Sequence, residues 1–145
     1  LLNAYIAIFD KILFDKPILI SPSTNIALNL VKGKKNPGCY LVFLIIISED
    51  PSDLNQFTDL LYDNQYEPIS VIIVGLGEND FSKTKEAFKA GMPHYNSKGE
   101  EFDRDFVTFL RFNDFGQGNL AQMTSTALFS VPDQAIHWAE INTIP

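Results

Sequence analysis

The fold is decided by an unbroken apolar run at residues 39–47, CYLVFLIII. The run is rich in β-branched and aromatic residues and contains no alternating polar positions. That pattern is typical of a strand buried on both faces, as in a parallel sheet. A second apolar run, ISVIIVG, occupies residues 69–75, and the alternating stretch FVTFLRF at 106–112 predicts a third strand.

Helical patterns precede the first strand. Residues 1–14 are predicted to form an amphipathic helix, because apolar side chains recur on one helical face at every third or fourth position. A second helix is predicted to start at Ser23 or Thr24, whose hydroxyl would cap free backbone N–H groups. Its buried face would carry Ile26, Leu30 and Val31.

Further helices are predicted between and after the strands. Ser52 or Asp53 would cap a helix that runs to about Gln65, and a short helix is expected over residues 81–90. Two closing helices are expected over residues 119–130 and 131–138. This alternation of helices and strands predicts an α/β domain with a mainly parallel sheet and right-handed crossovers.

The composition narrows the classes of protein. A chain of 145 residues suits one domain, and 46% hydrophobic with 20% charged residues is typical of a soluble globular protein. A net charge of −7 argues against nucleic acid as the main partner, because phosphate binding needs clustered basic side chains. The single cysteine, Cys39, cannot form an internal disulfide, which favours a reducing compartment. The longest apolar run is too short to span a membrane.

Six short stretches of the sequence carry a resemblance to a known family. They are AY at 4–5, SPSTN at 21–25, LIIISED at 44–50, SVIIVGLGENDF at 70–81, RDFVTFLRFNDF at 104–115 and VPDQ at 131–134. In these stretches and in their order, the sequence resembles the later part of the von Willebrand factor A-type domain of the copine family. The most specific stretch is VPDQ, which is close to the family's Ile-Pro-Asp-Gln.

The resemblance implies a fold and a function. Residues 1–145 would be a partial copine A-type domain, a von Willebrand factor A-like, Rossmann-like α/β fold that lacks the first strand or strands. The domain would be a non-enzymatic protein-binding part of a copine-like protein that binds phospholipid when Ca²⁺ is present. Membrane binding would belong to C2 domains absent from this chain, and the protein would be cytoplasmic with recruitment to the plasma membrane.

The resemblance also implies a metal-ion-dependent adhesion site in a degraded form. The family pattern is Asp-x-Ser-x-Ser, a Thr and an Asp, and no Asp-x-Ser-x-Ser occurs here. Thr24 matches the Thr, while the Asp position falls on Glu49, or on Ser48 when counted without a gap. The candidate residual ligands for Mg²⁺ or Ca²⁺ are Thr24, Glu49 and Asp50. The alternative interpretation is that Thr24 caps a helix and that Glu49 and Asp50 form a solvated turn.

Two other functions remain open. One is the A-type domain of a RING-type ubiquitin ligase, although no zinc-binding set of Cys and His occurs here. The other is a divergent α/β enzyme that uses Glu49, Asp50 or His94. No catalytic or cofactor-binding residue is predicted, because the sequence offers no nucleophile paired with a base. The glycines after the second strand also fail the dinucleotide pattern, since Asp80 stands at the third glycine position.

Overall fold

The computed structural model describes residues 17–32, 39–116 and 119–142. The helix predicted over residues 1–14 lies outside this part of the chain. The described elements are α2 (Ser21–Val31), β1 (Leu41–Ile47), α3 (Leu54–Asp63), β2 (Ile69–Gly75), α4 (Ser82–Ala87), β3 (Val107–Arg111), the 3₁₀ turn η1 (Phe112–Phe115), α5 (Leu120–Phe129) and α6 (Val131–Ile141). None of the described helices is long and apolar enough to cross a membrane.

The sheet is parallel, as predicted. Its described strands lie in the order β1-β2-β3, with Leu41 opposite Ile69 in one pair and Val71 opposite Val107 in the other. Every residue of the central strand β2 is buried. This confirms the α/β class that the alternating apolar runs predicted, and it places the carboxyl ends of all three strands at one edge of the sheet.

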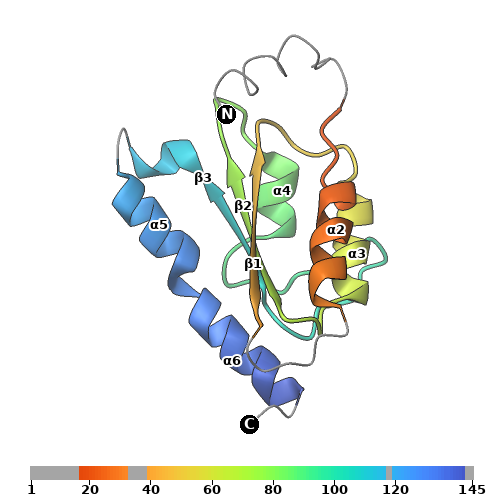
Figure 1. The fold of residues 1–145 in the computed structure, drawn as a ribbon. Helices are drawn as coiled ribbons and strands as arrows, with labels where there is room; N and C mark the ends of the chain where they lie inside the picture. Colours follow the sequence, from red (N-terminus) through yellow and green to blue (C-terminus); the bar gives the residue numbers. More distant parts are fainter. Residues whose placement is uncertain (1–16, 33–38, 117–118, 143–145) are drawn as a thin grey trace, which may run out of the picture.

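Helices cover the two faces of the sheet unequally. α2, α3 and α4 lie on one face and the α5–α6 arm on the other (Figure 1). The larger core contains Phe57, Phe81 and Phe106, each 0% exposed, together with alternate residues of β1 and β2. The smaller core joins Ile72 and Val74 of β2 to α5 through Ala127. The sheet is therefore a central layer with one fully built face.

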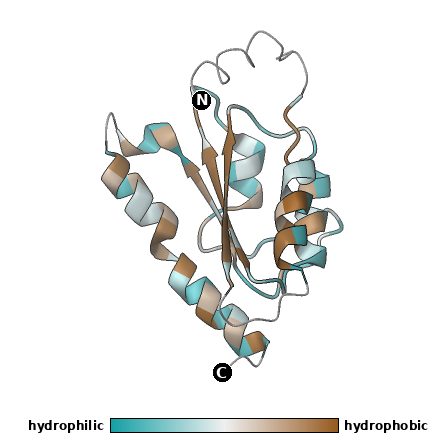
Figure 2. Cartoon of the chain, in the orientation of Figure 1, coloured by the Kyte–Doolittle hydropathy of each residue, from teal (hydrophilic) through white to brown (hydrophobic). Residues whose placement is uncertain are grey.

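The prediction that β1 is buried on both faces was wrong for the described residues. Only Ile45 and Ile47 of this strand are buried, whereas Val42, Leu44 and Ile46 are 41%, 55% and 59% exposed. Figure 2 shows this strand in the colour of hydrophobic residues, and in that view it runs between α2 and the α5–α6 arm. The reason is that α5 packs over β2 and β3 rather than over β1.

The predicted buried face of the second helix was right for Val31 and wrong for Ile26 and Leu30. Ile26 and Leu30 are 65% and 56% exposed, while Thr24, Leu28 and Val31 are buried. The helix begins two to three residues earlier than predicted, at Ser21, and no side chain of its own caps it. The buried residues of α2 are spaced three or four apart, as an amphipathic helix requires. The prediction of a helix was therefore right, but most of its buried side lies on other residues than those predicted.

Candidate functional site

The loops that follow β1, β2 and β3 meet at the carboxyl edge of the sheet, where open α/β folds bind ligands. They are linked side by side through hydrogen bonds. Asn79 donates from Nδ2 to the carbonyl oxygen of Ser48 at 2.7 Å, and Asn113 donates from Nδ2 to the carbonyl oxygen of Gly77 at 2.9 Å. The edge is thus a connected set of loops rather than three independent ones.

Asp53 binds the start of α2. Its carboxylate accepts hydrogen bonds from the backbone N–H of Ile20 at 3.0 and 3.1 Å and from that of Ser21 at 2.8 Å. These N–H groups belong to a helix terminus that has no intrahelical acceptor for them. Asp53 therefore caps a helix 32 residues earlier in the sequence, and it gives no side-chain cap to its own helix α3.

Asp50 binds the start of α4 in the same way. Its carboxylate accepts from the backbone N–H of Lys83 at 3.1 Å and of Thr84 at 2.9 Å, and from the Thr84 hydroxyl at 2.7 Å. A negative charge at a helix N-terminus is favourable, because the free N–H groups and the helix dipole are positive there. The loop after β1 thus attaches two helices to the sheet through two carboxylates.

Both carboxyl groups have a pKa below the ordinary value. Partial burial raises the pKa of Asp50, but the hydrogen bonds from Thr84 and Lys83 lower it further than burial raises it. The pKa of Asp53 is lowered likewise, since hydrogen bonds from Ser21 and Ile20 outweigh the effect of burial. Their contribution to stability is present above the unfolded pKa of about 4 and is lost as the pH falls through the lower folded values.

Two of the three predicted metal ligands, Thr24 and Asp50, have separate partners in the structure. The Thr24 hydroxyl is fully buried and donates to the carbonyl oxygen of Ile20 at 2.8 Å. Asp50 caps α4, and Glu49 is exposed beside it. Within residues 17–32, 39–116 and 119–142, no three His, Cys, Asp or Glu side chains gather in an arrangement suited to a metal. The metal site stays a prediction, and these contacts describe what its candidate residues do.

The glycine that ends β2 has a packing role. The ring of Phe81 lies where a Cβ at Gly75 would stand, and its Cε2 atom would be 2.9 Å away. Phe81 is fully buried at a φ of 52°, a conformation that L-residues seldom adopt. The loop after β2 therefore closes onto the strand through an aromatic ring. The contact with this ring explains why a glycine stands at position 75, which the failed dinucleotide pattern did not explain.

Gly75→Ala is expected to lower the free energy of unfolding by about 2 kcal/mol, because the added methyl group overlaps the Phe81 ring. Urea denaturation measures the change. Adding Phe81→Leu should relieve the overlap, so the double variant is expected to lose less than the sum of the single losses. Strict additivity of the two changes would contradict this contact.

A buried guanidinium holds the opposite end of the sheet. Arg104 is 3% exposed and donates to the carbonyl oxygens of Glu67 at 3.2 Å and Ile69 at 2.5 Å, and to the Tyr40 hydroxyl at 3.2 Å. Its central carbon lies 4.7 Å from the centroid of the Phe106 ring. The sequence placed this arginine in a motif but gave it no role, and the structure shows that it joins the starts of β1, β2 and β3.

The VPDQ stretch attaches α6 to the same end of the sheet. Gln134 accepts a buried hydrogen bond of 2.6 Å through Oε1 from the Ser70 hydroxyl. One turn later, Trp138 donates from its indole nitrogen to the carbonyl oxygen of Tyr66 at 2.8 Å. His137 lies in the same helix with its side chain exposed, whereas its neighbour Trp138 is buried.

His94 lies in the segment between α4 and β3 and is buried among aromatic rings. Its ring centroid is 5.4 Å from that of Phe88 and 6.3 Å from that of Phe102. Nδ1 lies 3.8 Å from a carboxylate oxygen of Asp105. Burial lowers the pKa of His94, and this outweighs the opposite effects of Asp105 and of the Lys89 carbonyl. His94 is therefore neutral in the folded protein at neutral pH.

The free energy of unfolding is expected to fall on acidification below about pH 6.5, the ordinary pKa of histidine in an unfolded chain. Below that pH the unfolded chain binds a proton that folded His94 does not, so stability falls by up to about 1.4 kcal/mol per pH unit. Urea denaturation from pH 7.5 to 5 measures this slope. His94→Gln should flatten it and His137→Gln should not; equal slopes in both variants would contradict the assignment.

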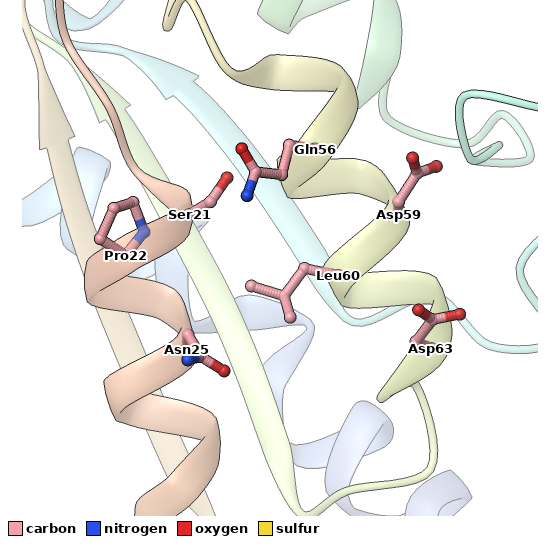
Figure 3. A pocket seen from close by; sticks show the side chains of 7 residues that line it. All are labelled: Ser21, Pro22, Asn25, Gln56, Asp59, Leu60 and Asp63. Carbon is pink, nitrogen blue, oxygen red and sulfur yellow. The ribbon is translucent and has the colours of Figure 1, made fainter.

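A polar hollow of about 410 Å³ separates α2 from α3. In Figure 3, Ser21 and Gln56 point toward each other across it, whereas Asp59 and Asp63 point away from α2. Asp59 instead accepts from the backbone N–H and the hydroxyl of Ser97, both at 2.8 Å. Its carboxylate therefore holds the loop after α4 and does not converge with the other groups of the hollow.

These features define the class of protein. A parallel sheet flanked by helices, with its carboxyl-end loop joined to neighbouring helices, is a von Willebrand factor A-like α/β fold. The sequence profile described as Copine matches residues 1–145. The chain therefore belongs to the copine family.

Relatives in two organisms show the extent of the similarity. The chain is 29% identical to Copine-B and 32% identical to Copine-D of Dictyostelium discoideum, over 71% and 78% of its length. It is 27% identical to Protein BONZAI 1 of Arabidopsis thaliana over 99% of its length. The aligned parts cover 20%, 21% and 25% of these proteins, so the chain spans about a fifth to a quarter of the relatives it matches.

Proposed function

We propose that the chain is a non-enzymatic protein-binding domain of a copine-like, Ca²⁺-dependent phospholipid-binding protein, and that its metal-ion-dependent adhesion site is degraded. The observation that carries the proposal is that two acidic residues after β1 bind helix N-termini. Asp50 and Asp53 accept hydrogen bonds from helix N-termini, so their oxygens serve the fold. A hard cation would need about six oxygen ligands at the same place.

Exposed apolar side chains support the binding role. β1 presents Val42, Leu44 and Ile46 on one face, and Phe129 at the end of α5 is 82% exposed. Contiguous exposed apolar surface is typical of protein interaction sites. We assign the chain no catalytic role.

Capture on beads tests the binding role. The immobilised chain is incubated with cell extract in Mg²⁺ or in EDTA, and bound proteins are identified by mass spectrometry. We expect a set of proteins above blank beads that EDTA does not change. Capture no greater than that of blank beads would overturn the binding role, and capture lost in EDTA would overturn its independence of metal.

Membrane association is assigned to C2 domains elsewhere in the full protein, which would be cytoplasmic and recruited to the plasma membrane. Vesicles containing phosphatidylserine test this division of roles by co-sedimentation with the chain. The chain is expected to stay in the supernatant with and without Ca²⁺. Pelleting that requires Ca²⁺ would contradict the assignment.

A further inference from the structure

A small pocket lies between α4, the segment after it and the end of β3. Its volume is about 260 Å³, which is below the range of about 300–1,000 Å³ typical of cofactor and drug sites. Three aromatic rings line it, those of Phe88, Phe109 and Phe115. A pocket of this size and lining suits one apolar side chain rather than a whole small-molecule ligand.

The rim of the pocket is positively charged. Lys85, Lys89 and Arg111 line it with a single carboxylate, that of Asp114. The chain as a whole has a net charge of −7, so this concentration of cations runs against the composition. A cleft in which one sign of charge predominates attracts ligands of the opposite sign.

The cations have unused hydrogen-bonding capacity. Lys85 and Lys89 are exposed, and in the part of the chain that the structure describes neither forms a salt bridge. Arg111 donates only one hydrogen bond there, from Nη2 to the carbonyl oxygen of Glu78 at 3.3 Å, and its Nε is buried without an acceptor. A guanidinium has five N–H donors, so most of its capacity remains for an anion.

We propose that this pocket binds an aromatic side chain within an acidic segment of a partner protein. The ring would enter between the phenylalanines, and flanking carboxylates would pair with Lys85, Lys89 and Arg111. Charge complementarity favours this partner, since charged patches of opposite sign set specificity and association rate. The inference rests on the proposed protein-binding function and names the chemistry of the partner.

Fluorescence anisotropy tests the inference with a labelled peptide, Gly-Asp-Glu-Phe-Glu-Asp-Gly. The wild-type chain is expected to bind it saturably, and Lys85→Gln with Lys89→Gln to weaken binding about tenfold. The matched control combines Lys32→Gln with Lys98→Gln, which removes two exposed lysines elsewhere and should change the Kd less than about twofold. All four lysines are exposed, so each variant should keep its thermal midpoint.

Two control peptides separate charge from shape. Replacing the acids by their amides, or the phenylalanine by serine, should each abolish saturable binding. Absence of binding to the first peptide, equal loss in both lysine variants, or unchanged binding of either control peptide would overturn the inference. If beads capture proteins but the peptide does not bind, only the inference falls; if neither binds, the proposed function falls with it.

Discussion

Arg104→Ala is expected to lower the free energy of unfolding by about 4 kcal/mol, the largest loss among the substitutions considered. The guanidinium donates to the buried carbonyl oxygen of Ile69, to the partly buried one of Glu67 and to the Tyr40 hydroxyl, and it lies over the Phe106 ring. Truncation removes one donor from each of these acceptors, although the Tyr40 hydroxyl still donates to the Ile69 carbonyl oxygen, and it opens a cavity beside a fully buried ring. Urea denaturation of the two chains measures the loss.

Arg104→Lys separates geometry from charge. Lysine keeps the positive charge but not the planar fork that reaches several acceptors, so we expect about half of the alanine effect. Lys98→Ala removes an exposed cation from a loop and should change stability by less than about 0.5 kcal/mol. A loss below about 1 kcal/mol for Arg104→Ala would show that this network does not hold the sheet.

Asp53→Ala is expected to cost about 3 kcal/mol, because a charged acceptor for two helix N–H groups is lost. The effect should be local as well as global. Hydrogen exchange at the amides of Ile20 and Ser21 should become faster, because these are the groups that Asp53 binds. Urea denaturation gives the global loss and exchange gives the local one.

The control for this cap is Ser52→Ala, a change at the neighbouring exposed residue. It should leave both measurements within error. Below about pH 4 the wild type and Asp53→Ala should converge in stability, because the folded carboxyl also becomes protonated as the pH falls through its lowered pKa. An unchanged gap between the two chains down to pH 2 would contradict the role of the carboxylate charge.

The strands could be predicted because their signal is local. Ile69–Gly75 is apolar throughout and is buried throughout, so composition and position agree. The phase of α2 could not be predicted, since the cap that fixes its start comes from Asp53, 32 residues later in the sequence. The exposed face of β1 could not be predicted either. It depends on which strands α5 covers, and the apolar run of β1 carries no information about the position of α5.

In the candidate site, too, the sequence predicted the kind of residue but not its partners. Oxygen-bearing residues after a parallel strand favour both a metal site and a helix cap, because each uses Asp, Glu, Ser or Thr. Asp50 was predicted as a candidate metal ligand or as part of a solvated turn, and its hydrogen-bond partners Lys83 and Thr84 could be identified only from the fold. Arg104 was missed because nothing in the sequence marks a buried arginine whose partners are backbone carbonyls.

Calorimetric titration of the chain with Mg²⁺, Mn²⁺ and Ca²⁺ tests most directly whether the acids after β1 serve the fold instead of a metal. We predict no saturable heat below about 1 mM for any of the three ions, because Asp50 and Asp53 are engaged by helix N-termini. Saturable binding below that concentration, abolished by Asp50→Asn in a variant that still folds, would contradict the account.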